Sequence, residues 1–370
     1  MNKLIKTFNS GRAIFYVMVI ICIIVVAAVL KLTSTIILPF IIAILVALIM
    51  FPIIKLMDKI RCPRTVSIFF VVIIVIAGML LFGAVLFSSG RHIVDQVQED
   101  GNIYTVRIVS VYNWAADTFN LQNDEAQTLL ENLWDQPVVR GGIQNIAQSF
   151  SFFLIRFVTS AVLMVIFLVF ILVEATYFKL KIITAFENRI GNFDRMGNEI
   201  IRQVARYLGT KFLFSVANGL IYAVGFSVVG LEFAVEWGII QFLLNFIPTL
   251  GSIAGGVIIT LFAMLQFLPD NTTAVFIVLG IILGVNLILS NILDPKIVGD
   301  QVGISPLAVM ISLSFWGFIW GFIGMLIAVP MTVIIKIVCE NIPMLEPISI
   351  LLGSRKAVQK KKAEFDKAEA

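Results

Sequence analysis

Eight stretches of this 370-residue chain are almost free of charge and long enough to cross a lipid bilayer as helices. About 20 apolar residues span the hydrocarbon core, and a helix is favoured there because it pairs its backbone polar groups internally. The stretches are 13–30, 35–54, 66–87, 151–173, 212–231, 237–265, 274–293 and 307–338. They predict an all-α polytopic membrane protein with about eight hydrophobic segments, embedded in the lipid bilayer.

The composition excludes the main soluble alternatives. Hydrophobic residues make up 59% of the chain and charged residues 14%, against about 45–50% and about 25% in an ordinary soluble domain. The mean hydropathy is +1.01. A soluble fold cannot hide this much apolar surface, so we exclude a cytosolic enzyme, a disordered protein and a disulfide-rich secreted domain.

Metal, disulfide and nucleotide chemistry find no support in the sequence. Cys22, Cys62 and Cys339 lie far apart and His92 is the only histidine, so neither a zinc site nor a disulfide framework is indicated. The motifs GxGxxG, GxxxxGK and GxSxG are absent. We therefore expect no enzyme activity, no metal and no cofactor, and any pumping would use an ion gradient or a partner.

The distribution of lysine and arginine predicts the orientation. Basic residues gather in 3–12, 55–64, 174–211 and 355–367, whereas the segment 88–150 is predominantly acidic. Cytoplasmic loops of membrane proteins carry an excess of basic residues. Both termini are therefore expected in the cytoplasm and 88–150 outside the cell membrane. These loops account for the net charge of +4, which gives no reason to expect nucleic-acid binding.

The chain divides into parts of different composition. The outer segment is amphipathic, and 138–173 is long enough for one helix of about 50 Å, so we expect helices that project from the membrane. The four apolar spans up to residue 173 contain only two glycines and no asparagine, whereas the spans after residue 212 are rich in both, which is typical of broken helices and polar paths. The expected division is N-terminal scaffold spans 1–87, extracytoplasmic helices 88–150, the long fourth span with cytoplasmic helices 151–211, a transport region 212–338 and a charged cytoplasmic tail 339–370.

Two of the apolar segments are too long for one upright span. Segment 237–265 contains Asn245, Pro248 and Gly251 near its middle, where proline frees a carbonyl and glycine tolerates a sharp turn. Segment 307–338 resembles it. Its glycines and proline, together with one glycine of the first segment, are the expected hinge and packing residues: Gly255, Gly317, Gly321, Gly324 and Pro330. Each segment is either a re-entrant or broken hairpin or a single kinked helix.

The choice between these alternatives changes the topology. If both segments cross fully, loop 266–273 lies inside; if both are hairpins, it lies outside. Lys296 in the loop 294–306 slightly favours two hairpins, because basic loops are cytoplasmic. Two hairpins that enter from opposite sides would resemble the transport domain of an elevator transporter.

A polar face marks the end of segment 274–293. Asn286, Ser290 and Asp294 stand four residues apart and would share one face of an α-helix, with Asn291 beside them. Polar groups in hydrocarbon are costly unless they meet partners or water. These four polar side chains either contact the solute or have only a structural role, in contact with a neighbouring helix and the membrane interface. The expected substrate path is Asn245, Pro248, Thr249, Gly251, Asn286, Ser290, Asn291 and Asp294.

The start of segment 212–231 also carries polar residues. Lys211 and Asn218 would either line a cytoplasmic vestibule or act as a membrane anchor and a packing group.

Several linked motifs resemble the AI-2E (autoinducer-2 exporter-like) transporter family. They are Phe-Ile-Pro-Thr-Leu-Gly-Ser-Ile at 246–253, Asp-Pro-Lys-Ile-Val-Gly at 294–299, Val-Gly-Ile-Ser-Pro-Leu at 302–307, the glycines of 317–324 and Ala-Val-Pro at 328–330. Asp294 stands where the family often has an acidic or polar residue, and Thr249 where an aromatic or small residue is common. The resemblance implies a bacterial or archaeal transporter, a ring-like homo-oligomer (a pentamer) and elevator-type motion.

The resemblance also implies candidate substrates. Members are linked to export of the furanone-type signal autoinducer-2, and others to Na+/H+ exchange. The leading hypothesis is an exporter of a small polar solute; the alternative is a Na+(Li+)/H+ antiporter, which requires a titrating carboxylate. Asp294 is the best candidate for that carboxylate, but the spans carry no mid-membrane Asp or Glu. A third class is a scaffold or channel without coupled transport.

Overall fold

A computed structural model describes residues 10–99, 101–119, 137–185, 190–248, 250–293, 303–355 and 358–359. In these ranges the chain is helical apart from turns and one isolated β-bridge, between Ile304 and Gly353. Seven of the described helices are long and apolar enough to cross a membrane. The prediction of an all-α polytopic membrane protein is confirmed.

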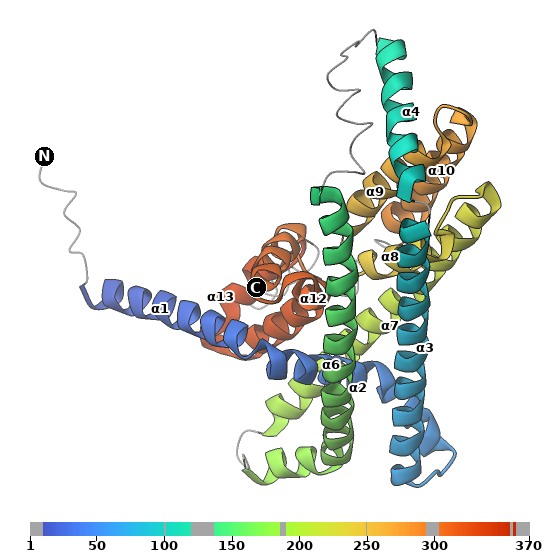
Figure 1. Ribbon diagram of the computed structural model, residues 1–370. Helices are drawn as coiled ribbons and strands as arrows, with labels where there is room; N and C mark the ends of the chain where they lie inside the picture. The colour runs from blue at the N-terminus through green and yellow to red at the C-terminus, as the bar shows by residue number, and fades with distance from the viewer. Residues whose placement is uncertain are drawn as a thin grey trace, which may run out of the picture.

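Three helices form a closely packed group at one side of the molecule (Figure 1). They are α2 (Ser34–Lys59), α3 (Arg64–Glu99) and α6 (Pro137–Ala185). Their shared core includes Ala43, Val71 and Leu168, all fully buried. At 49 residues, α6 would be about 73 Å long, so it extends beyond the expected 138–173 at its C-terminal end.

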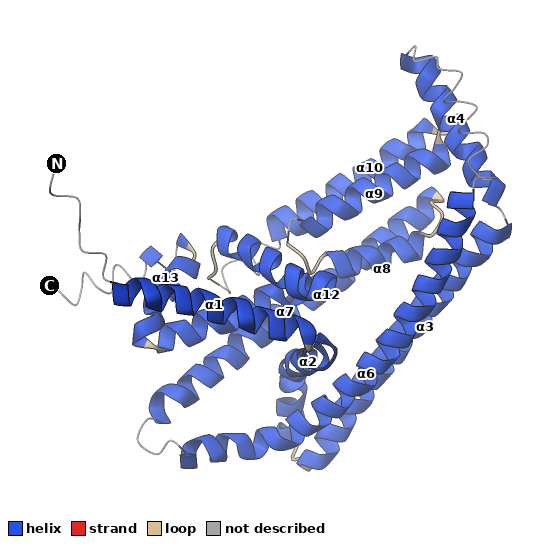
Figure 2. Ribbon diagram, turned by 60° about the vertical axis from the view of Figure 1, so that its left-hand side comes forward, coloured by secondary structure: helices blue, strands red, loops and turns tan. Residues whose placement is uncertain are grey.

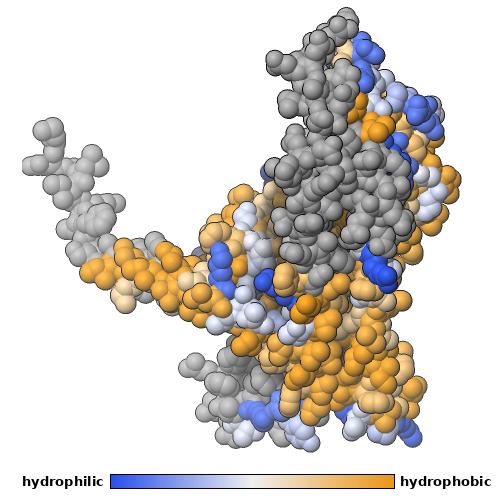
Figure 3. Space-filling model, in the orientation of Figure 1, coloured by the Kyte–Doolittle hydropathy of each residue, from blue (hydrophilic) through white to orange (hydrophobic). Residues whose placement is uncertain are grey.

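The surface of this group is apolar. Figure 3 shows a broad hydrophobic area over α3 and α6, with hydrophilic residues below it. Phe69, Leu80 and Leu81 of α3 and Phe170 of α6 are more than 60% exposed. A broad exposed area of apolar side chains on helices long enough to cross a membrane is expected to contact lipid. The helix α4 (Gly101–Phe119) projects beyond this area.

A 40-residue helix, α7 (Ile190–Val229), runs through the second half of the fold and organises it. Near its C-terminal end, Tyr222 and Phe226 pack with α8 (Ala234–Leu244), α9 (Leu250–Phe267) and α10 (Thr272–Val285). Nearer its N-terminal end, Val204, Tyr207 and Leu208 pack against α12 (Pro306–Asn341). Both long apolar segments therefore rest on α7.

The first of these segments is a hairpin, called hairpin 1 below (α8 and α9). Gln266, at the end of α9, accepts from the Glu232 amide at 2.8 Å and donates to the Gly230 carbonyl at 2.9 Å, just before α8. One turn further in, the rings of Trp237 and Phe262 lie 5.3 Å apart. The two legs are thus antiparallel, and the alternative of one kinked helix is wrong here because the backbone leaves the helix between Leu244 and Leu250.

The second segment, α12, is also a hairpin, called hairpin 2 below. Gly321 has φ 63° and ψ −142°, which reverses the chain within the helix. Ser312 of the first leg donates to the Ala328 carbonyl of the second leg at 3.0 Å, and Ser312 also bonds Thr332. The base of the hairpin is fastened to the C-terminal region, where the Ser305 amide donates to the Leu352 carbonyl at 2.8 Å beside α13 (Glu346–Leu352).

The two hairpins open toward opposite ends of α7. Hairpin 1 has its open end at Gly230, beyond the C-terminus of α7, beside α4: Arg107 of α4 forms a two-bond ion pair with Glu232, at 2.7 and 3.0 Å. Hairpin 2 has its open end with Ile304 and Ile337, in the cluster that includes Met196 and Ile200 of α7. Figure 2 shows the two hairpins extending to opposite sides from the middle of the molecule.

Two further features differ from expectation or complete the fold. Segment 274–293 is not one regular α-helix, because α10 ends at Val285 and a π-helix, η1 (Asn286–Leu293), continues it. The first helix, α1 (Ser10–Leu32), is exposed over most of its length and extends away from the other helices (Figure 1). Its end contacts hairpin 2, where the Trp320 indole donates to the Leu30 carbonyl at 3.0 Å.

Candidate functional site: a buried polar layer beside a hairpin tip

The tip of hairpin 1 is closed by a glycine. A methyl group on Gly251 would lie 1.8 Å from the carbonyl oxygen of Leu244, so only glycine lets the returning leg pass this close. Asn245 and Pro248 form the turn between the legs, and both are largely removed from solvent. Thr249, the remaining tip residue of the expected path, lies outside the described residues.

The tip of hairpin 2 uses the same device. A methyl group on Gly324 would lie 1.9 Å from the Trp316 carbonyl oxygen, and one on Gly317 would lie 2.9 Å from the Met325 side chain. Gly321 supplies the turn between them. The three glycines were expected as hinge or packing residues, and each has a steric or conformational reason to be glycine. Pro330, expected with them, is buried in the second leg away from the tip.

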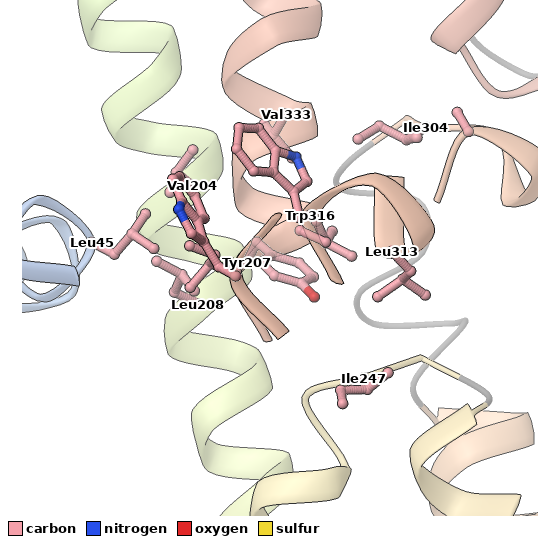
Figure 4. Packing of buried hydrophobic residues seen from close by; sticks show 14 of the residues in the cluster. Leu45, Val204, Tyr207, Leu208, Ile247, Ile304, Leu313, Trp316 and Val333 are labelled. Carbon is pink, nitrogen blue, oxygen red and sulfur yellow. The ribbon is translucent and has the colours of Figure 1, made fainter. Parts of the chain in front are cut away.

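Both hairpins contribute residues to one buried cluster. Ile247 of hairpin 1 belongs to the same buried cluster as Leu313 and Trp316 of hairpin 2, against Tyr207 and Leu208 of α7 (Figure 4). The indoles of Trp316 and Trp320 stack there with centroids 4.8 Å apart. This shared cluster therefore lies beside α7, between the open ends of the two hairpins.

A row of buried polar side chains on α7 approaches this cluster. Lys211, Ser215, Asn218 and Tyr222 are each at most 2% exposed. Their spacing of four, three and four residues places them on one face of the helix. Burial of such groups is unfavourable unless they find polar partners, so the residues that face the row are informative.

Hairpin 1 supplies one partner for this row and places a second buried amide side chain near it. The Asn245 amide nitrogen donates to the Ser215 hydroxyl at 3.0 Å, which ties the tip to α7. One turn back along α8, Gln241 is 1% exposed. The side-chain amide of Gln241 packs against the backbone of Gly255 in α9. A methyl group added to Gly255 would lie 2.4 Å from Gln241 Nε2. Gly255 thus provides room for a polar side chain inside the hairpin.

The junction of α10 and η1 completes the layer. The Tyr222 hydroxyl lies 3.4 Å from Oδ1 of Asn286 and 3.4 Å from the Ile282 carbonyl. A methyl on Gly256 would lie 3.0 Å from Ile282 and 3.9 Å from the Asn286 amide nitrogen. A π-helical turn inside an apolar helix is frequently found at functional sites. We call the six residues Ser215, Asn218, Tyr222, Gln241, Asn245 and Asn286 the polar layer.

The layer contains amide and hydroxyl groups but no carboxylate. Over the described part of the chain, no group of three or more His, Cys, Asp and Glu side chains could hold a metal ion. Neutral donors and acceptors suit recognition of a small polar solute by hydrogen bonds. The second buried polar group, Ser312 with Thr332, is satisfied within hairpin 2, and the adjacent Lys336 pairs with Glu340 at 3.0 Å.

Sequence reasoning found part of this arrangement. Asn245, Gly251 and Gly255 come together in hairpin 1, and Asn286 joins them through Tyr222. Ser290 and Asn291 lie in η1, but their side chains are outside the described residues, as is the whole of Asp294. Lys211 and Asn218 are both buried, so Lys211 is not an exposed anchor.

Ser215, Tyr222 and Gln241 were not among the predicted site residues. The signal that could have found those on α7 is the spacing of its polar residues, because four, three and four residues is the repeat of one helix face.

Comparison with known proteins is consistent with this geometry. Residues 15–344 match the family described as AI-2E family transporter. The AI-2 transport protein TqsA of Escherichia coli is 28% identical over 336 residues, which cover 87% of this chain and 91% of that protein. A putative transport protein of Haemophilus influenzae is 27% identical over 334 residues, covering 90% and 94%. One of Borreliella burgdorferi is 35% identical over 205 residues, which span 54% of this chain and 55% of the relative.

Proposed function

The chain belongs to the AI-2E family of membrane transporters, and from this premise we propose that it moves a small polar solute across the cell membrane by alternating access. The observation that carries the proposal is a buried polar layer beside the tip of hairpin 1, between two hairpins that open toward opposite ends of α7. Discontinuous helices that end near the membrane centre are the usual way in which transporters build a solute site.

The packing supports an elevator-type motion. α2, α3 and α6 share a core of their own, and α7–α10 share another. We propose that the first group is a scaffold fixed in the lipid and that hairpins 1 and 2 move with α7 as the transport unit. Such motion would expose the polar layer first to one side and then to the other.

We propose that the solute is an autoinducer-2-like signal that leaves the cell. The relative TqsA is described as an AI-2 transport protein, and an uncharged hydroxylated solute matches the uncharged polar layer. With both termini in the cytoplasm, Gly230 and loop 268–271 would face outward together with α4. The homo-oligomer, a pentamer by family resemblance, belongs to the same proposal.

Flux measurements in proteoliposomes test the proposal and its alternatives. The purified full-length chain should release autoinducer-2 from loaded vesicles faster than protein-free vesicles do, and a sodium or pH gradient should change the rate. Sodium or lithium flux coupled to proton movement, without autoinducer-2 flux, would instead support the antiporter. Gradient-independent flux of many solutes would support a channel, and no flux of any of them would contradict a transport function.

A further inference from the structure

Two buried amide atoms of the polar layer have no hydrogen-bond partner among the residues that the structure describes, and one is an acceptor whereas the other is a donor. Asn218 is 2% exposed and its Oδ1, an acceptor, is unpaired; Gln241 is 1% exposed and its Nε2, a donor, is unpaired. A buried donor or acceptor that forms no hydrogen bond raises the free energy of the folded protein. Such groups require an explanation, and an absent polar ligand is one.

The antiparallel packing of α7 against α8 places Asn218 and Gln241 at the same height along the helix pair, here called one level. Ser215 bonds Asn245, and a methyl on Gly219 would lie 2.8 Å from the Gly238 carbonyl and 3.0 Å from Phe242. In this antiparallel pairing, Asn218 stands opposite the turn that carries Gln241. The two unpaired atoms therefore belong to one level of the helix pair, one turn from the tip of hairpin 1.

Three glycines around Asn218 and Gln241 let the helices approach each other closely and leave room for the polar side chains. Gly219 and Gly238 bring the backbones of α7 and α8 into contact, and Gly255 of α9 leaves the space that the Gln241 amide occupies. Three glycines from three helices thus frame one donor and one acceptor. A core that needed only packing would place apolar side chains here, because well-packed apolar groups carry no cost of unpaired hydrogen bonds.

The chemistry of the two atoms limits what binds. A hydroxyl group both donates and accepts, so it can satisfy Asn218 Oδ1 and Gln241 Nε2 together or through adjacent hydroxyls. A bare cation requires several oxygen ligands and would be repelled by the donor end of Gln241. We propose that Asn218 and Gln241 are the solute-reading residues of this transporter and that they bind an uncharged solute through its hydroxyl groups. This inference rests on the proposed function.

Two variants and one control test the site. Asn218→Leu and Gln241→Met keep the bulk of each side chain and remove its hydrogen-bonding atoms. Ser227→Ala serves as control, because Ser227 is an exposed residue of the same helix whose hydroxyl bonds only its own backbone, at Ala223. The measurements are the KM for autoinducer-2 flux in proteoliposomes and the unfolding temperature in detergent.

Each site variant should raise the KM about five- to tenfold, since one neutral hydrogen bond to the solute is lost. The unfolding temperature should stay the same or rise, because neither variant breaks a bond of the described structure. Ser227→Ala should leave both measurements unchanged. If both site variants keep the wild-type KM, or lose unfolding temperature together with flux, Asn218 and Gln241 are not solute-reading residues.

A second measurement separates failure of the site from failure of the proposed function. If the wild type carries no autoinducer-2, transport of that solute is wrong, but the site can still be tested by thermal unfolding in ribose, autoinducer-2 or sodium chloride. Stabilisation by a hydroxylated solute that is lost in Asn218→Leu supports the site. Stabilisation by sodium alone, or by none of the three, overturns it.

Discussion

The side chain of Asn245, at the tip of hairpin 1, donates a 3.0 Å hydrogen bond to the hydroxyl of Ser215 in the middle of α7. Both residues are buried. A hairpin that enters a membrane only part of the way leaves its turn without regular backbone pairing, so a side-chain bond at the tip has particular weight. It fixes the position of the tip relative to the polar row on α7.

Removing one partner of this bond should therefore destabilise the fold. Ser215→Ala leaves the Asn245 amide nitrogen buried and unpaired, at a cost of about 1–3 kcal/mol. We expect a lower unfolding temperature in detergent, whereas Ser227→Ala, on the exposed side of the same helix, should change it little. An unfolding temperature for Ser215→Ala equal to that of the wild type would show that the bond does not hold the tip.

The glycines that close the two tips make a second prediction. Gly251→Ala and Gly324→Ala would drive a methyl group into the Leu244 and Trp316 carbonyls. Relief requires the legs to separate, so both variants should express poorly or unfold at a lower temperature.

The matched control is Gly284→Ala in α10, where nothing lies within 4 Å of the added methyl. It should be neutral or stabilising by up to about 1 kcal/mol, because alanine favours the helix. Equal behaviour of all three variants would mean that the close approach of the legs is not required.

The tip of hairpin 1 shows which structural features could be predicted from the sequence and which could not. A proline and a glycine inside an over-long apolar segment predicted a break near Asn245, because neither continues a helix well, and the break is there. The choice between a kink and a hairpin depends on contacts such as Gln266 with Gly230, which are distant in sequence and leave no local pattern. The level of Gln241 relative to Asn218 depends on the same pairing.

The change from α10 to a π-helix at Asn286 was not predictable either. The residues 286–293 are less apolar than those before them, because they include Asn286, Ser290 and Asn291. These polar residues fit an α-helix equally well, and a π-helical turn differs from an α-helical one in its hydrogen-bond register. The expected division at residue 212 rests on composition, and the packing is not divided there: Leu45 of α2 lies in one buried cluster with residues of α7 and α12. The exact division stays a prediction, because α7 runs across residue 212 without interruption.

Asn286 provides a test of the polar layer from its α10 side. The distance of 3.4 Å to the Tyr222 hydroxyl is long for a hydrogen bond between oxygens, so Asn286→Leu should cost little stability. If Asn286 contacts solute, flux should fall about tenfold. Tyr222→Phe is the matched variant, because it removes the same contact from the other side. A large and equal loss of unfolding temperature in both variants would make the pair structural instead.

The hairpin topology predicts which loops share a side of the membrane. In a chain without Cys22, Cys62 and Cys339, a single cysteine at Thr272 should react with an impermeant reagent from the same side as one at Asp117, and from the opposite side to one at Lys55. All three introduced positions are exposed in the structure. Labelling of Thr272→Cys from the side of Lys55 would contradict hairpin 1 and restore a full crossing of segment 237–265.

The ion pair between Arg107 and Glu232 joins the projecting helix α4 to the open end of hairpin 1. Both side chains are about a quarter exposed, so its stabilising effect should be about 1 kcal/mol or less. If hairpin 1 moves relative to α4 during transport, Glu232→Gln should change the rate of flux by more than it changes the unfolding temperature. The double variant Arg107→Glu with Glu232→Arg should recover part of the wild-type rate, because it restores opposite charges at the contact. The pair Arg202 and Glu199, which lies within α7 alone, is the control: Glu199→Gln should leave flux unchanged. Equal flux in Glu232→Gln and the wild type would show that this contact does not limit the movement of hairpin 1.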